Sequence, residues 1–254
     1  MNLQVFVAMH KPYPQPSDSV YIPLHVGRSG KPPLCAAGDD TGDNLSAKNA
    51  NYCELTGLYW MWKNVNADYL GLVHYRRYFA HRGLWGDKWK RILSREELQR
   101  ELAACDVLLP KQRHYVIETN RSQYIHAHNE ADLQVTKDCI RALCPEYLPA
   151  FEHSMKQTHG HRFNMLVMKK TLLDAYCTWL FALLFEIESR LDISQYSAAD
   201  ARVFGYLSER LLDVWLFHNK VAYRELPVLF MEPVNWVKKG TRFVLRKLGI
   251  HHQP

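Results

Sequence analysis

Short apolar runs alternate with longer amphipathic stretches along most of this chain. Leu3 to Ala8 alternates around two valines and predicts a buried first strand, and the apolar run from Tyr69 to Val73 predicts another strand. Long helices are expected at Thr171 to Arg190 and at about Ala199 to His218, and the second carries its large apolar residues on one side. Strands that alternate with helices are typical of an α/β layer fold, which we therefore expect here.

Local signals predict where several elements begin and end. Ser94 followed by Glu97 has the pattern of a capping box, which predicts a helix that ends near Cys105. Asp43 or Ser46 could cap a helix that runs to about residue 63. Residues 111 to 131 show no strong period. The other expected elements are strands at Asp106–Pro110 and Phe163–Met168 and a helix at about 131–143, and Tyr21–Val26 is a short apolar segment.

Length and composition fit an ordinary globular protein. The chain has 254 residues, of which 47% are hydrophobic and 23% are charged, and either one large domain or two small ones would fit this length. The longest uninterrupted apolar run, Trp179 to Phe185, is far too short to span a bilayer. The first residues have no basic flank and too short an apolar stretch for a signal peptide, so we expect a cytoplasmic protein.

Cysteines and histidines show no metal-binding pattern. The six cysteines have no CxxC pair or zinc-finger spacing, which favours free thiols in a reducing compartment. The doublets His126-x-His128 and His159-x-His161 lack cysteine or carboxylate partners at zinc-site spacing, so we predict no metal site. The net charge of +6 favours anionic partners without choosing among them.

Four polar residues, His74-Tyr75-Arg76-Arg77, follow the strand that is predicted to end at Val73. The carboxyl ends of strands are where ligands bind in open α/β sheets, so these arginines are expected at a ligand-binding edge. Each guanidinium presents fixed donors that match phosphate or carboxylate oxygens, which points to a phosphorylated substrate. The alternative is that one arginine pairs with a core carboxylate such as Glu54.

Two long blocks of this sequence, Gly42–Asn64 and Tyr69–Phe79, resemble the signature of the DUF4422 family of bacterial glycosyltransferases. The resemblance covers roughly residues 3 to 218. It implies a GT-A-like nucleotide-diphosphosugar transferase fold, with a mixed central sheet flanked by helices, which we expect to form a single domain over residues 1–233. Family members occur in capsule and lipopolysaccharide gene clusters, and some are assigned as galactofuranosyltransferases. Three shorter blocks resemble further family motifs: Pro23–Gly27, Phe163–Met168 and Arg202–Leu211.

The resemblance implies transfer of a sugar, with galactofuranose as a candidate, from a UDP-sugar donor to a growing, lipid-linked surface polysaccharide. GT-A enzymes often hold a divalent cation with an Asp-x-Asp at the end of the fourth strand, but here His74–Arg77 stands in that place. We infer that Arg76 or Arg77 supplies the positive charge, and that Mn²⁺ or Mg²⁺ is not essential. Three carboxylates upstream could still chelate an ion: Asp39, Asp40 and Asp43.

Candidate donor-binding residues lie in two further places. Asp40, Asp43 and Asn44 form an acidic loop that could contact the nucleobase or ribose, although a solvated turn would also explain them. His10 and Lys11 end the first strand, where GT-A folds meet the nucleotide, although Lys11 could simply be exposed. Within the resembling blocks we add Asn49, His74, Tyr75, Asn164 and Arg202 as donor-binding candidates.

Direct displacement also requires a base for the acceptor hydroxyl. Asp132 is our first candidate, because it follows the polar stretch Tyr124–Glu130, which is typical of a cleft wall. Glu209 is the second, since a helix-borne carboxylate among apolar residues can have a raised pKa, but it could instead pair with Arg202 or Arg210. Glu130 and Asp200 are further options. The candidate catalytic residues are therefore Asp132, Glu209, Arg76 and Arg77.

The C-terminal residues 234–254 form a basic tail after the expected domain. On a helix, residues 236–248 would place apolar side chains on one side and basic ones mostly on the other, which suits an anionic membrane surface. Such contact would hold an enzyme near a lipid-linked acceptor at the inner face of the cytoplasmic membrane. The alternatives are a helix packed on its own domain or a solvated tail.

Two other classes of function remain open from the sequence alone. Net charge and basic-aromatic clusters would suit a nucleic-acid-binding module, but the chain lacks the signatures of the common modules, so we expect no nucleic-acid partner. A catalytically inactive sugar-binding protein of the same fold is the second alternative.

Overall fold

The computed structural model describes residues 1–83 and 86–232 of the chain. Within these ranges nine strands form one sheet, and two further strands, β7 (Arg113–His114) and β8 (His159–Gly160), form a separate pair. The strands of the large sheet are β1 (Leu3–Met9), β2 (Tyr21–His25), β3 (Ala37–Gly38), β4 (Tyr69–His74), β5 (Arg77–Phe79), β6 (Val107–Pro110), β9 (Leu166–Lys169), β10 (Arg224–Leu226) and β11 (Val228–Phe230).

The sheet is mixed, and its order is β10-β6-β9-β4-β1-β2-β3. β1 pairs in parallel with β2 on one side and with β4 on the other, so these strands end at a common edge. β9 runs antiparallel between β4 and β6. β5 continues from β4 and pairs with β11. The predicted mixed central sheet is therefore confirmed.

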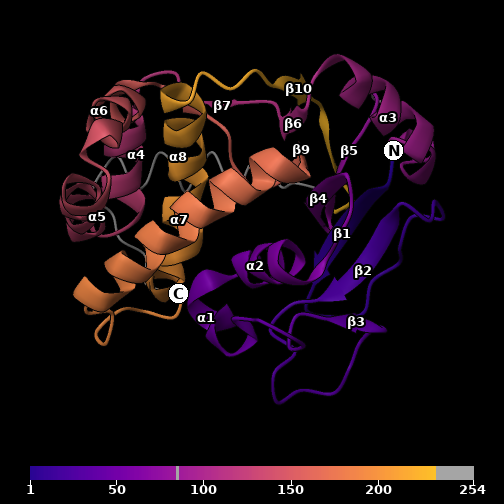
Figure 1. Ribbon diagram of the computed structural model, residues 1–254, viewed down its shortest axis with the longest axis horizontal. Helices are drawn as coiled ribbons and strands as arrows, with labels where there is room; N and C mark the ends of the chain where they lie inside the picture. The colour runs from indigo at the N-terminus through magenta and orange to yellow at the C-terminus, as the bar shows by residue number, and fades with distance from the viewer. Residues whose placement is uncertain (84–85, 233–254) are drawn as a thin grey trace.

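Helices cover the sheet on both faces (Figure 1). Because side chains alternate along β1, Phe6 packs with the residues of α2 and α7 in one core, whereas Val5 and Val7 pack with Leu98 of α3 in another. The helices are α1 (Asn49–Tyr52), α2 (Leu55–Asn64), α3 (Arg95–Ala104), α4 (Asn120–Ala127), α5 (Glu130–Leu143), α6 (Leu148–Lys156), α7 (Lys170–Arg190) and α8 (Val203–His218).

The helix that we predicted up to about residue 63 is interrupted. Cys53 has a positive φ of 53°, which separates α1 from α2. Neither predicted cap is used: the Ser46 hydroxyl donates to Asp39 Oδ1 over 2.5 Å, and Asp43 Oδ1 accepts from Tyr59 Oη over 3.0 Å. The break turns the α1–α2 junction toward the carboxyl ends of the strands, where it lines a cavity.

Other expectations differ from the structure at their boundaries. The capping box of Ser94 and Glu97 at the start of α3 is confirmed. The strand expected at Phe163–Met168 begins only at Leu166, because Phe163 and Asn164 have positive φ values of 83° and 49°. The stretch without a strong period contains α4, whose N-terminus is capped by Thr119.

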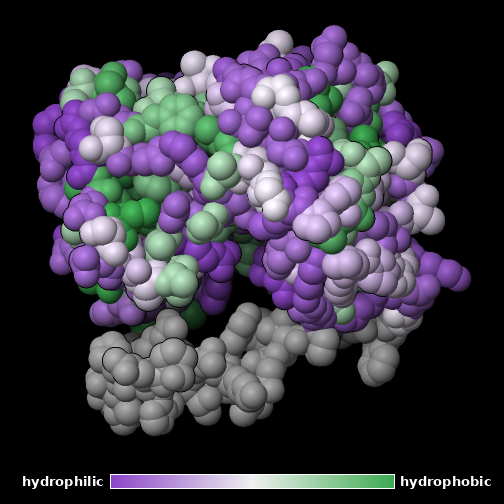
Figure 2. Space-filling view, turned by 90° about the horizontal axis from the view of Figure 1, so that it is seen from below, coloured by the Kyte–Doolittle hydropathy of each residue, from purple (hydrophilic) through white to green (hydrophobic). Residues whose placement is uncertain are grey.

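The predicted basic tail, residues 234–254 with the segment 236–248, lies outside the described residues. In the part of the chain that the structure describes, no helix is both long and apolar enough to cross a membrane. Figure 2 shows that hydrophobic residues on one face gather mainly at the left, on the side of the helical layer, while the sheet side at the right is largely hydrophilic.

Candidate functional site

A cavity of about 840 Å³ lies at the carboxyl ends of β1 and β4. We call it the strand-end cavity. The α1–α2 junction, the loop before β9 and the first turns of α8 complete its walls. It brings together most of the site residues predicted from the sequence: His10, Asn49, His74, Tyr75, Arg76, Arg77, Arg202 and Glu209.

Arg77 lies in the cavity with no ion pair to neutralise it among the described residues. Its Nη1 donates to His74 Nδ1 over 3.3 Å, and its guanidinium lies 4.7 Å from the centre of the Phe163 ring. Burial, together with the charge of Arg77, lowers the pKa of His74 to about 3, so the imidazole accepts as a neutral group. Arg77 Nε is buried and has no hydrogen-bond partner within the described ranges. A buried donor of this kind suits an anionic ligand.

Arg76 lies beside Arg77 but is partly neutralised. Its Nη1 lies 3.0 Å from Glu232 Oε2, and its guanidinium lies 4.9 Å from the centre of the Tyr75 ring. Arg76 therefore pairs with Glu232 and not with Glu54, which was the alternative for one of the arginines. The hydroxyl of Tyr75 is buried and lacks a hydrogen-bond partner within residues 1–83 and 86–232.

Arg202 and Asn49 enter the cavity from the helical side. Arg202 Nε donates to Cys53 Sγ over 3.1 Å. Asn49 Nδ2 donates to the carbonyl oxygen of Cys53 over 2.7 Å and to Thr56 Oγ1 over 3.0 Å, so it stabilises the break between α1 and α2. Burial raises the pKa of the Cys53 thiol to about 11, which keeps it protonated near neutral pH.

Two carboxylates lie in the same cavity. Glu209 Oε1 accepts from the backbone N–H of Phe163 over 2.9 Å, and its side chain is 19% exposed. Its Oε2 lies 3.5 Å from Arg210 Nη1, so the alternative of a pair with Arg210 is present in the structure. Glu54 Oε1 accepts from Asn164 Nδ2 over 2.7 Å, and burial raises the pKa of Glu54.

Sequence reasoning did not predict Glu54, Lys31 or Tyr206 as site residues, although all three line the cavity. Glu54 was considered only as a core partner for an arginine, and it lies inside the block Gly42–Asn64.

The cavity is positively charged overall. Its lining includes four cationic side chains, Lys31, Arg76, Arg77 and Arg202, against the two carboxylates Glu54 and Glu209. This balance, with histidines neutral, leaves an excess of two positive charges. A concave site with such a field attracts an anion.

The structure places the acidic loop outside the cavity. Asp40 Oδ1 lies 2.5 Å from Arg28 Nε, and the side-chain amide of Asn44 donates to the carbonyl oxygen of Gly42. Asp43 contacts Tyr59 instead of a ligand-binding wall. Lys11 is also outside the lining, with its Nζ 5.7 Å from the centre of the Tyr75 ring.

Asp132 does not line the strand-end cavity either. It is almost fully buried, and its two oxygens accept from Tyr124 Oη over 2.7 Å and from Tyr196 Oη over 2.6 Å. Burial raises the pKa of Asp132, against the effect of the two tyrosine hydroxyls. These contacts assign it to the packing of α4 and α5. Asn164 lies behind Glu54 and acts on the cavity through it.

Among the described residues, no group of three or more His, Cys, Asp or Glu side chains could hold a metal ion. Asp39, which we considered as a chelator, is fully buried and accepts from the backbone N–H groups of Gly27 and Arg28. Its role in the structure is to fix the turn after β2.

Comparison with known proteins shows the family of this chain. Residues 4–220 match a protein family described as Domain of unknown function (DUF4422). The chain belongs to this family. A search of curated proteins gives no significant match.

A solved structure is also similar to this DUF4422 chain. It is the apo structure of WbbM, which is described as a bifunctional glycosyltransferase. The two are 30% identical, with a TM-score of 0.84, over 92% of this chain and 46% of the WbbM chain. The chain therefore shares its fold with part of a glycosyltransferase and spans about half the length of that protein.

Proposed function

We propose that this chain transfers a sugar from a nucleoside-diphosphate donor to a hydroxyl group of a glycan. The observation that carries the proposal is the convergence of Arg76, Arg77 and Arg202 on one cavity at the carboxyl ends of parallel strands. Guanidinium groups match phosphate oxygens in geometry and charge. The similarity to WbbM supports the same class of reaction.

The reaction requires a base for the acceptor hydroxyl and a group that stabilises the departing diphosphate. A carboxylate takes the proton of the acceptor hydroxyl, whose oxygen attacks the anomeric carbon of the donor. The bond from that carbon to the diphosphate oxygen breaks, and the electron pair leaves on the diphosphate. Arg76 and Arg77 would stabilise this developing charge, which is the role that a divalent cation has in many such enzymes.

Glu209 is the base that we propose. Its carboxylate lines the cavity and remains partly accessible, so a hydroxyl group can reach it. Each of the two carboxylates accepts a hydrogen bond from the loop before β9, but burial raises the pKa of Glu54, which leaves more of it protonated at a given pH, so Glu54 is less suited. We assign Glu54 to positioning the groups around the base.

The finer assignments rest on the sequence blocks Gly42–Asn64 and Tyr69–Phe79. We propose UDP as the carrier, galactofuranose as a candidate sugar, and a growing, lipid-linked surface polysaccharide as the acceptor. The basic tail would then contact the inner face of the cytoplasmic membrane. No divalent cation is required in this proposal.

A donor screen tests the proposal. Transfer or donor cleavage is measured with UDP-galactofuranose, UDP-galactopyranose and UDP-glucose, and binding is followed by thermal shift with UDP and with short oligonucleotides. We expect stabilisation by UDP and turnover of at least one donor. Stabilisation by oligonucleotides alone would favour a nucleic-acid-binding module, and UDP binding without turnover of any donor would favour an inactive sugar-binding protein.

A further inference from the structure

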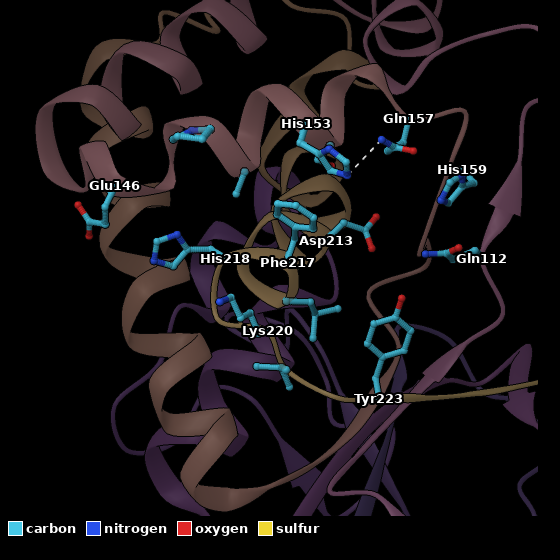
Figure 3. Close-up of a pocket in the computed structure, with 15 residues that line it drawn as sticks. Gln112, Glu146, His153, Gln157, His159, Asp213, Phe217, His218, Lys220 and Tyr223 are labelled. Carbon is cyan, nitrogen blue, oxygen red and sulfur yellow. Dashed lines mark hydrogen bonds between the residues drawn. The ribbon is translucent and has the colours of Figure 1, made fainter.

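A second cavity, of about 560 Å³, is lined by residues from the C-terminal half of α8, whereas the strand-end cavity is lined by residues from its N-terminal half. We call it the α6–α8 cavity, because those two helices form it together with residues 220–223 and Gln112. Figure 3 shows the side chains of Gln112, Asp213 and Tyr223 directed toward one open space, with Phe217 beside it. Its volume is within the range of small-molecule sites.

The hydroxyl group of Ser154, unpaired among the described residues, indicates that this cavity binds a ligand. Ser154 lines this cavity from α6 and is only 3% exposed, yet its hydroxyl has no hydrogen-bond partner in the part of the chain that the structure describes. Leaving a buried hydroxyl unpaired costs about 1–3 kcal/mol. A ligand with hydroxyl groups would supply both a donor and an acceptor for it.

The rest of the lining combines aromatic rings with planar polar groups. Phe217 is 53% exposed and stacks on His153 with 4.2 Å between ring centres, and Gln157 Nε2 donates to the same imidazole over 3.1 Å. Tyr223 is 39% exposed. Apolar ring surfaces can pack against the C–H groups of a sugar, while amides and hydroxyls bind its hydroxyl groups.

Charge distinguishes the two cavities. The α6–α8 cavity contains two carboxylates, Glu146 and Asp213, and one lysine, Lys220; Asp213 is paired with the buried Arg162, so the remaining groups leave no excess charge with histidines neutral. The strand-end cavity has an excess of two positive charges. A diphosphate therefore favours the strand-end cavity, and a neutral ligand suits the α6–α8 cavity.

The two cavities are neighbours along α8, with the buried side chain of Arg162 between them. Glu209 lines one and Asp213, one helical turn later, lines the other. Arg162 Nη1 lies 3.3 Å from the carbonyl oxygen of Glu209 and 3.5 Å from Asp213 Oδ2. At about 1.5 Å per residue, Phe217 is roughly 12 Å from Glu209 along the axis of α8, a length that a few linked sugar units cover.

We propose that the α6–α8 cavity binds a neutral sugar unit of the acceptor glycan, several units away from the hydroxyl that reacts in the strand-end cavity. This inference rests on the proposed function, because the reacting end of the same glycan must reach Glu209.

Direct binding in the absence of donor tests it. Galactose oligosaccharides from the disaccharide to the hexasaccharide are titrated into the full chain and followed by calorimetry and saturation-transfer NMR. We expect Phe217→Ala and Ser154→Ala each to weaken binding about five- to tenfold. Leu143→Ala is the matched control, because Leu143 is 51% exposed and lies outside this cavity, and it should bind as the wild type does. Absence of binding, or equal binding by wild type and Phe217→Ala, would overturn the inference.

A second comparison separates this inference from the proposed function. Arg77→Ala should weaken UDP binding and keep oligosaccharide binding. If no donor is turned over but the oligosaccharides bind and depend on Phe217, the proposed function is overturned, and the α6–α8 cavity keeps sugar binding but loses its acceptor role. If transfer proceeds and Phe217→Ala has an unchanged KM for the longest acceptor, only the α6–α8 site is overturned.

Discussion

Asn164 Nδ2 donates a hydrogen bond to Glu54 Oε1 over 2.7 Å, although the two residues are 110 positions apart. The preceding residue, Phe163, donates its backbone N–H to Glu209 Oε1 over 2.9 Å. Both donors have positive φ, a backbone conformation that residues other than glycine rarely adopt. The loop before β9 therefore fixes both carboxylates of the strand-end cavity, and its unusual backbone is stabilised by these contacts.

Arg77→Ala should lower turnover about 10²–10³-fold with little change in melting temperature, because it removes a charge that stabilises the leaving group. Arg76→Ala should also lower turnover, but less, since Glu232 already shares that guanidinium. Steady-state kinetics and thermal unfolding measure both effects. Arg100→Ala is the control, because that side chain is 76% exposed and outside the cavity. Near-wild-type turnover in both variants would remove the phosphate assignment.

Glu209→Gln should lower kcat about 10²–10⁴-fold while UDP binding is kept, because an amide cannot take the proton of the acceptor. Asp132→Asn is the comparison. It should lower the melting temperature through its contacts with Tyr124 and Tyr196 and change kcat only slightly. The reverse pattern, with kcat lost in Asp132→Asn and kept in Glu209→Gln, would restore Asp132 as the base.

EDTA should reduce activity only weakly. Arginine and lysine side chains supply the positive charge of the strand-end cavity, so the diphosphate has partners without an ion. Turnover is compared before and after dialysis against EDTA, and after addition of Mn²⁺ or Mg²⁺. Complete loss of turnover with recovery on adding either ion would show that the expectation is wrong.

The stability of the fold should depend on His74 below neutral pH. The pKa of His74 is lowered from 6.5 to about 3, mainly by burial and then by Arg77, so the unfolded chain binds a proton that the folded chain does not. The contribution of the neutral imidazole to the free energy of unfolding is complete above pH 6.5. It is lost as the pH falls toward 3, by up to about 1.4 kcal/mol per pH unit.

Urea unfolding of the wild type and His74→Gln, as a function of pH, measures this effect. The introduced amide would keep an acceptor for Arg77 but does not titrate, so the variant should lose less stability than the wild type between pH 6.5 and 3. Parallel profiles for the two proteins would contradict the burial of a neutral imidazole.

The prediction for the basic tail rests on sequence alone. The full chain should co-sediment with vesicles that contain anionic lipid at low salt and bind less at high salt, because each basic residue near the surface contributes roughly 1 kcal/mol. A chain that ends at Pro233 should bind much less. Equal binding by both, or none by either, would remove the membrane role of residues 236–248.

The sequence predicted those parts of the site that depend on local pattern. An apolar run that ends at Val73 places the following arginines at the carboxyl edge of β4, wherever the rest of the chain packs. The capping box at Ser94 is local in the same sense, since both of its hydrogen bonds lie within one helical turn.

Contacts between distant segments could not be predicted in this way. Glu54 joins the cavity only because Cys53 breaks the helix and Asn164 arrives from the other half of the chain. Asp132 follows a polar stretch, as a cleft residue would, but two tyrosine hydroxyls bury it in the helical layer. Neither outcome has a signature in the spacing of neighbouring residues.

The continuity of α8 has a consequence for acceptor length. Its 16 residues form one uninterrupted helix from Val203 to His218, with one cavity at each end. A rigid rod of this kind keeps the distance between the two cavities constant, whatever the loops around them do. The fixed spacing sets a minimum length for a glycan that occupies both cavities. A glycan too short to reach from Phe217 to Glu209 can bind in only one of the two.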